Sequence, residues 1–356
     1  MFLHYGFSKD ALRLIGGCGL LTALLLHPDA SGAPEAVHSF ESPSNSVRVG
    51  RFGIDLPADA VFSGATLELN GVPVSITPGY TKARVKREAR NDWLSIESRN
   101  LDNTEHKATQ EALKNGSLIY TYDHTRITGE GLGGEPINNV VYSTVAYQWC
   151  NGMLFKLGND STLNKDERIR TILDSIELSD INEHENLCYG NGCLPHTKGG
   201  EEVYVLFSFS EHPNLRAKFT SVQYGGAANS FFSQRNSSSS SPVNAAAWII
   251  NSGFQHRTYR NTKRTVNHFI GEEIIEASTE KSDGGYLTEV NAVWYYPGVP
   301  YSNDKPELRF DLNYSYMTTQ KPKNGAAFPD QDTPNSITEA QFMRIWDQAL
   351  NSLVTK

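Results

Sequence analysis

The sequence has few charged residues and no apolar run long enough to cross a membrane. Charged side chains make up 20% of its 356 residues, too few for a coiled coil or a charge-rich disordered chain. The apolar stretch at residues 14–26 spans 13 positions, whereas a transmembrane helix needs about 20. The formal net charge of −8 argues against a general affinity for nucleic acid or for an anionic membrane surface. What remains is a Gly-rich globular protein.

The signatures of the common catalytic designs are absent as well. The sequence has no Gly-x-Ser-x-Gly elbow, no His-Glu-x-x-His pair, no Walker loop and no Gly-x-Gly-x-x-Gly that opens a helix. Glu272 and Glu273 could supply an acid–base pair, but neighbouring residues of a strand point to opposite faces, which disfavours joint catalysis. Cys150, Cys188 and Cys193 have no clustered histidines beside them to complete a zinc site. We therefore predict no enzymatic activity, no cofactor and no metal site.

The first 33 residues have the pattern of a secretory signal peptide. Lys9 and Arg13 precede the apolar stretch, and small residues follow it between Ala30 and Ala33. The pattern predicts that the protein is exported and that residues 1–33 are not part of the fold. Cys18 lies in a segment similar to a lipoprotein cleavage box. Lipid anchoring at Cys18 is the weaker alternative, because the apolar stretch continues for eight residues beyond it.

Removal of the signal peptide leaves three cysteines, Cys150, Cys188 and Cys193. An odd number in an oxidising compartment predicts one disulfide and one free thiol. Cys188 and Cys193 flank two glycines that would let a small loop close, which favours a Cys188–Cys193 bond. A Cys150–Cys188 bond is the rival pairing. Cys150 lies in a segment that resembles a strand, where a lone cysteine packs as a small hydrophobe.

The rest of the chain divides into two halves of similar design, which suits its length. The polar segment 180–200 predicts a linker between an N-terminal module at residues 37–179 and a C-terminal module at residues 201–356. Each module is expected to be an antiparallel β-sheet with a packed C-terminal helix. The predicted fold class is therefore α+β, with two related modules.

Both closing helices carry the same sequence signals. Ser336 and Glu339 have the spacing of a capping box, and apolar residues then recur at helical intervals. In the first half, Asn164 and Glu167 begin a similar helix. A further helix is expected over residues 104–114.

Alternating apolar residues predict the strands, and Asn70-Gly71 predicts a two-residue hairpin turn between two of them. The strands expected in the first half are residues 47–56, 66–69, 72–76, 117–122, 140–147 and 153–157. Those expected in the second half are residues 202–210, 216–224, 245–250, 265–277, 286–296 and 307–317.

One basic cluster and one aromatic segment are suited to contacts with another protein. The cluster includes Arg257, Tyr259 and Arg260, and it indicates a charged hairpin tip or a docking patch for an acidic protein surface. The aromatic segment contains four candidate interface anchors, which are Trp294, Tyr295, Tyr296 and Tyr301. Packing beneath a hairpin is the alternative for these rings. The same ambiguity applies to Phe231 and Phe232, which lie beside a serine-rich stretch.

Several short motifs, in order along both halves, resemble those of a known family. The first is Val-Gly-Arg-Phe-Gly-Ile-Asp-Leu-Pro at residues 49–57. The others are Lys263-Arg264 leading to Gly271-Glu-Glu273, Trp294 followed by Pro297-Gly298 and Pro306, and Ile345-Trp-Asp347 followed by Leu350-Asn-Ser-Leu353. The chain resembles the periplasmic immunity proteins that protect bacteria from phospholipase effectors of the type VI secretion system, a family with paired N- and C-terminal domains.

The resemblance implies a binding protein without catalysis. Its partner would be a cognate phospholipase effector, held inactive in the periplasm by occlusion of the active-site entrance or of the lid. The shared motifs concern the fold, so no contact residue follows from them. One rival hypothesis is a binding module for a glycan or lipid of the cell envelope. Another is a hydrolase of unfamiliar design.

Overall fold

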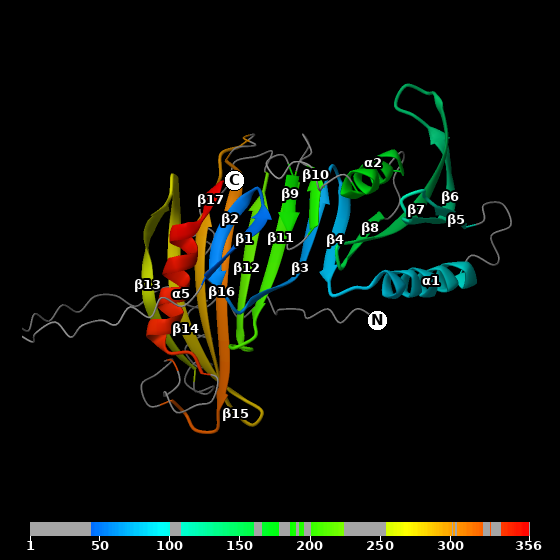
Figure 1. Ribbon diagram of the computed structural model, residues 1–356. Helices are drawn as coiled ribbons and strands as arrows, with labels where there is room; N and C mark the ends of the chain where they lie inside the picture. Colours follow the sequence, from blue (N-terminus) through cyan, green and yellow to red (C-terminus); the bar gives the residue numbers. More distant parts are fainter. Residues whose placement is uncertain are drawn as a thin grey trace, which may run out of the picture.

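The computed structural model describes residues 44–99, 108–159, 166–177, 186–189, 192–195, 201–223, 254–300, 302, 305–322, 328 and 336–355. Over these ranges the fold is α+β, as predicted, with two antiparallel sheets and the helices α1 (Lys82–Arg99), α2 (Asp166–Glu177) and α5 (Glu339–Ser352) (Figure 1). The predicted signal peptide, Cys18, Phe231, Phe232, Tyr301 and the strand 245–250 lie outside these ranges. No helix in the described ranges has both the length and the apolar character to cross a membrane.

The larger sheet has twelve strands, and every neighbouring pair is antiparallel. Its strands from the first half are β3 (Ala60–Leu69), β4 (Val72–Pro78), β5 (Thr109–Ala112), β6 (Leu118–Glu130), β7 (Pro136–Cys150) and β8 (Met153–Asn159). Its strands from the second half are β11 (Glu201–Phe209), β12 (Leu215–Val222), β13 (Gln255–Val266), β14 (Phe269–Ser282), β15 (Gly285–Tyr296) and β16 (Glu307–Thr318).

The two halves follow the same path through this sheet. Outward from the centre, the first half runs β3-β4-β8-β7-β6-β5 and the second runs β11-β12-β16-β15-β14-β13. The closing helix α2 follows the first set of strands in the chain, and α5 follows the second. The halves join edge to edge where β3 pairs with β11, with Leu69 opposite Glu201. The two related modules therefore repeat one topology and share one continuous sheet.

A smaller sheet ties the ends of the chain to the second half. It consists of β10 (Gly192–Pro195), β9 (Asn186–Tyr189), β1 (Ser44–Gly50), β2 (Phe52–Pro57) and β17 (Val354–Thr355), in that spatial order. The prediction of one strand over residues 47–56 was wrong, because Gly50 takes a left-handed backbone with φ 67° and the chain reverses at Arg51. Two of these strands, β9 and β10, lie in the segment predicted to be a linker.

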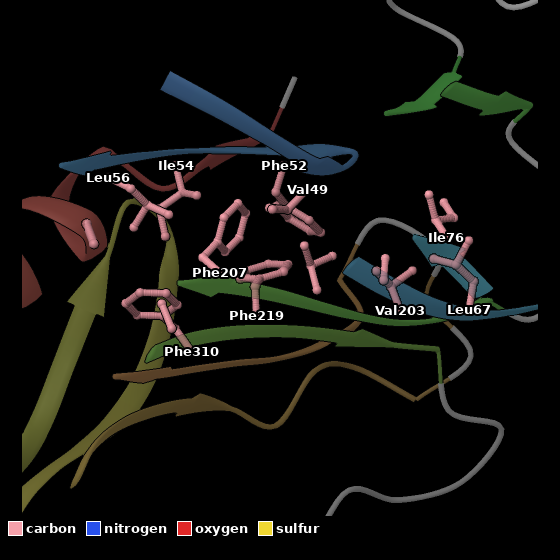
Figure 2. Close-up of a cluster of buried hydrophobic side chains, with 14 of the residues drawn as sticks. Val49, Phe52, Ile54, Leu56, Leu67, Ile76, Val203, Phe207, Phe219 and Phe310 are labelled. Carbon is pink, nitrogen blue, oxygen red and sulfur yellow. The ribbon is translucent and has the colours of Figure 1, made fainter. Parts of the chain in front are cut away.

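The main core lies between this smaller sheet and the larger one. Figure 2 shows Phe52, Ile54 and Leu56 of β2 pointing toward Phe207, Phe219 and Phe310. The ring of Phe52 lies 5.5 Å from that of Phe219 between centroids. Since alternate residues of a strand share a face, the β1–β2 hairpin turns one apolar row onto the sheet beneath it.

The expected helix at residues 104–114 was wrong, and the helix actually present begins earlier. Residues 109–112 form β5, and Asn115 and Gly116 lie in the turn that leads to β6. Helix α1 was missed because its apolar residues form a narrow stripe on a charged helix. Val85, Ala89 and Ile96 of that stripe are buried with Tyr120 and Tyr147 in a second, smaller core on the other face of the sheet; the complete buried set is Val85, Ala89, Ile96, Tyr120, Val145, Tyr147 and Leu154.

The closing helix α5 is present as expected, but its cap lies two residues later. Thr338 is the N-cap, and its Oγ1 accepts a hydrogen bond from the backbone N–H of Gln341 at 3.2 Å. The Gln341 Oε1 accepts in return from the backbone N–H of Thr338 at 2.8 Å, which completes the box. The predicted Ser336/Glu339 box was therefore wrong in position, while the apolar stripe is buried at Phe342, Ile345, Trp346, Ala349 and Leu350. The Asn70-Gly71 hairpin turn is confirmed.

Candidate interaction surfaces

The basic cluster of β13 is engaged by the closing helix. Both terminal nitrogens of Arg260 donate to Asp347 of α5, Nη1 to Oδ1 at 2.6 Å and Nη2 to Oδ2 at 2.8 Å. Arg264 donates to the same Oδ1 from Nη1 at 2.7 Å. A bidentate arginine–carboxylate pair fixes both position and orientation. These two guanidinium groups therefore hold α5 on the sheet.

Glu273 of β14 lies beneath this pair and is almost fully buried. Its Oε1 accepts from the indole Nε1 of Trp346 at 2.5 Å and from Nη1 of Arg264 at 2.8 Å. Its neighbour Glu272 is only partly buried, so the expectation that the two carboxylates point to opposite faces is confirmed. Glu273 is a buried acceptor within an ionic network and forms no acid–base pair with Glu272.

The charges of this network stabilise one another. Burial opposes ionisation of Asp347, but the hydrogen bonds from Arg260 and Arg264 outweigh burial and lower its pKa. In turn, the hydrogen bond to Asp347 is the largest influence on Arg260 and raises the pKa of its guanidinium. The network contains two cations and two carboxylates, so this part of β13 is not a free basic patch. In this structure, Arg260 stabilises the packing of α5 on the sheet through Asp347.

The aromatic anchors of β15 are divided between the two faces of the sheet. Trp294 has no exposed surface, and its Nε1 donates to the carbonyl oxygen of Arg264 at 3.2 Å. Its ring lies so close to Gly271 that a Cβ there would come within 2.5 Å of Nε1. Tyr295 is buried on the opposite face, and the half-buried Tyr296 packs on Phe269 with centroids 5.0 Å apart. Packing is therefore the role of Trp294 in this structure.

Arg257 and Tyr259 of the basic cluster keep an accessible face. Arg257 is exposed, and its Cζ lies 4.5 Å from the centroid of the Tyr259 ring, a cation–π distance. The Tyr259 ring is partly buried against Phe328, with centroids 5.7 Å apart. Burial raises the pKa of its hydroxyl to about 12, so Tyr259 stays a neutral hydrogen-bonding group at physiological pH.

The two loop cysteines face each other across a short hairpin. Cys188 of β9 pairs directly with Cys193 of β10. Directly opposed residues of antiparallel strands have Cα atoms about 4.5–5.5 Å apart, inside the range of about 4.4–6.8 Å that a disulfide requires. The Cys188–Cys193 bond stays a prediction with favourable geometry. The Sγ of Cys150 lies 3.9 Å from the carbonyl oxygen of Ile176, and the Cys150–Cys188 pairing stays the alternative.

Sequence reasoning missed a projecting hairpin that we call the arm, residues 125–141 of β6 and β7. The arm extends past the neighbouring strands at one end of the larger sheet (Figure 1). It carries the exposed apolar side chains Ile127 and Leu132. The signal that could have found it is the alternation in Thr-Arg-Ile-Thr before a glycine-rich turn at residues 129–134.

Within the ranges that the structure describes, no group of three or more His, Cys, Asp or Glu side chains is arranged to hold a metal ion. The polar clusters in these ranges pair cations with carboxylates. The network around Glu273 stabilises the fold, and the surfaces described above are the candidate functional elements.

Comparisons with known proteins agree with this description. Residues 181–356 match the family described as the Tle cognate immunity protein 4 C-terminal domain. Among curated proteins, none matches the chain.

Solved structures share the fold over 88% of this chain. The structure titled "The crystal structure of Tle4-Tli4 complex" matches with a TM-score of 0.55 and 16% identity, covering 88% of this chain and 97% of its own. The apo structure of the immunity protein TplEi of the type VI secretion system from Pseudomonas aeruginosa matches with a TM-score of 0.55 and 17% identity, covering 88% and 97%. The same protein complexed with an "L" peptide matches with a TM-score of 0.54, 17% identity and coverage of 88% and 98%. At this identity the likeness concerns the fold.

Proposed function

The C-terminal half of the chain, residues 181–356, belongs to the family of Tle cognate immunity protein 4 C-terminal domains, and from this we propose that the protein is a type VI secretion immunity protein. In this proposal it binds a cognate phospholipase effector and holds it inactive by covering its active-site entrance or its lid. It acts as an inhibitor and not as an enzyme. The family match is the observation that carries the proposal, and the fold supports it over 88% of the chain.

The shape of the larger sheet suits capture of a protein. Twelve strands spaced about 4.8 Å apart extend roughly 50 Å from β13 to β5. The seam between β3 and β11 joins the halves through nine paired positions, so the two ends of the sheet are parts of one body. A rigid span of this length can contact a partner at two separated points without a large ordering cost on binding.

At the β13 end of the sheet, we propose that Arg257 and the exposed part of Tyr259 contact the effector. An arginine stacked on an aromatic ring is a typical anchor of protein interfaces. Phe231, Phe232 and Tyr301 remain proposed contacts on sequence grounds. Trp294 and Tyr295 are left out of these proposed contacts because they are buried, and Arg260 because its guanidinium is paired with Asp347.

The proposed site of action is the periplasm. Immunity proteins of this kind act there, and the N-terminal sequence of this chain has the pattern of a signal peptide. We propose cleavage within residues 30–36, which releases a mature chain beginning near Ala36. Lipid anchoring at Cys18 is the alternative, and it would keep the protein at the membrane instead of releasing it into the periplasm.

Affinity capture tests the proposed partner. The chain from Ala36 onward, carrying an affinity tag, is mixed with a candidate effector, chosen as a phospholipase encoded beside its gene, and the eluate is analysed by light scattering. A complex of fixed stoichiometry that persists through washing supports the proposal, because self-protection requires slow dissociation. Recovery of the chain alone, with retention on an envelope glycan or lipid matrix, would replace it with the envelope-binding hypothesis.

A further inference from the structure

The arm separates from the sheet at a β-bulge. The register between β6 and β7 shifts between Tyr122 and Thr125, and Asp123 there takes a left-handed backbone with φ 52°. Below this point, β5 pairs with residues 118–121 of β6 and β8 pairs with residues 144–150 of β7. Beyond it, from Thr125 opposite Val141 onward, no other strand in the described ranges pairs with either edge. Bulges bend a strand, and this one marks where the arm leaves the body.

The tip of the arm is a closed loop of five residues, Gly131-Leu-Gly-Gly-Glu135. The backbone N–H of Gly131 donates to the carbonyl oxygen of Glu135 at 2.7 Å, and that of Gly134 donates to the carbonyl oxygen of Gly131 at 2.9 Å. Gly134 has φ 81°, a conformation that suits glycine. These contacts set the shape of the loop before any partner binds, which lowers the entropic cost of binding.

Leu132 stands alone at the apex of this loop. Its side chain is fully exposed, and its neighbours Gly131, Gly133 and Gly134 have no side chains. On the paired strands of the arm below this loop, which we call the shaft, Ile127 exposes 48% of its surface. A hairpin of two strands gains little stability from its own packing, and exposed apolar groups on open strand edges favour association. The arm is therefore a narrow hairpin with an apolar tip, which we call its head, and this shape suits insertion into an opening of a partner.

Carboxylates lie at the base of that head. Glu130 closes the shaft opposite Pro136, and the Glu135 side chain folds back over the positions where Gly131 and Gly133 would carry a Cβ. The tip thus presents an aliphatic group followed by negative charge. A phospholipid presents the same order of chemistry, an acyl chain followed by a phosphate diester.

We propose that the tip of the arm, residues 131–135, enters the lipid-binding opening of the phospholipase effector and blocks it. Leu132 contacts the apolar wall that receives the acyl chain, and Glu135 faces the groups that receive the phosphate. This inference rests on the proposed function and adds the element, the residue and the surface of the partner. The opposite end of the sheet, at β13, then supplies the second contact.

The test is the affinity of full-length mature protein for a catalytically inactive form of the neighbouring phospholipase, measured by calorimetry. Leu132→Glu places a charge in the apolar contact and is expected to weaken binding by 30-fold or more, as for a central interface residue. Because Leu132 has no buried surface, the melting temperature should not change. Met317→Glu is the matched control, since Met317 is 53% exposed on β16 in the other half, and it should bind within threefold of the wild type.

The outcomes distinguish the role of the arm from the proposed immunity function. If the wild type binds and Leu132→Glu binds equally well, the arm inference is overturned while the immunity proposal stands. If the wild type itself binds no effector, both are overturned. If the tip instead binds a second copy of this protein, the wild type should form a dimer. Leu132→Glu should then dissociate this dimer without loss of affinity for the effector. If the tip instead binds a membrane, the wild type should float with phosphatidylethanolamine–phosphatidylglycerol vesicles. Leu132→Glu should then abolish flotation and leave the affinity for the effector unchanged. Either result contradicts the assignment of the tip to the effector.

Discussion

Arg51 donates a hydrogen bond from Nη2 to Oε2 of Glu201 at 2.8 Å across 150 positions of sequence. Arg51 lies in the turn of the β1–β2 hairpin, and Glu201 is the first residue of β11, at the seam between the two halves. Only 2% of the Glu201 surface is exposed. One ion pair therefore fastens the N-terminal hairpin to the start of the second half.

Removing Arg51 should destabilise the protein strongly. Arg51→Ala leaves the Glu201 carboxylate buried without its cation, and we expect a loss of about 3 kcal/mol in the free energy of unfolding. Urea titration followed by circular dichroism measures it. Lys263→Ala, which removes an exposed cation of β13, should cost less than about 0.5 kcal/mol.

A double variant sharpens this prediction. In Arg51→Met with Glu201→Met, both charges are replaced by apolar groups, so the loss should be smaller than that of Arg51→Ala. A double variant less stable than the sum of its single variants would show that the pair is not what links the hairpin to the seam.

Glu273 should matter far more than its neighbour. Glu273→Ala removes the acceptor shared by Trp346 and Arg264, and we expect a loss of about 3–5 kcal/mol. Glu272→Ala, on the other face of β14, should lose about 1 kcal/mol or less. Thermal unfolding and the tryptophan fluorescence spectrum report both effects. Equal melting temperatures for the two variants would refute a central role for the network.

The closing helix should loosen in acid. The pKa of Asp347 is lowered in the folded state from about 3.9 in an unfolded chain. The folded state therefore gains stability from this group at pH values above about 4, and this gain disappears as the pH falls through the lowered pKa. The difference in unfolding free energy between wild type and Asp347→Asn should be constant above about pH 5 and shrink below pH 4. A difference that does not vary with pH would contradict this assignment.

The thiol count tests the predicted disulfide. In denaturant without reductant, the chain from Ala36 onward should react with a thiol reagent at Cys150 alone. After reduction it should react at Cys150, Cys188 and Cys193. The closed loop is short, so the bond should contribute less than the roughly 3 kcal/mol of a 15-residue loop. Detection of all three thiols before reduction would exclude the bond.

Strands with one buried face were predictable from the sequence, because alternation of apolar residues reports burial directly. The paired strands β3 and β4 illustrate this, with Leu67, Leu69, Val72 and Val74 all buried around the Asn70-Gly71 turn. The repeat of the two halves was visible in their closing helices. Its full extent, six strands in one order, depends on pairings between distant segments that no local pattern records.

The surface elements were harder to predict for physical reasons. Tryptophan is a residue type common among interface anchors, so the sequence suggested that role for Trp294. The close approach of Gly271 in the structure shows that the ring is enclosed. Arg260 belongs to a basic cluster in the sequence, but its partner Asp347 follows 87 positions later. The arm was missed because its strands continue β6 and β7, and no boundary in the sequence marks the bulge where it leaves the sheet. Burial and long-range pairing decide these cases.

The proposed activity of this protein is inactivation of a phospholipase by binding. The most direct measurement is the hydrolysis of phospholipid vesicles by the neighbouring phospholipase, titrated with the chain from Ala36 onward. Phospholipase activity should fall linearly and reach zero at a fixed molar ratio, with no recovery upon dilution over minutes. Full phospholipase activity in the presence of excess protein would contradict it.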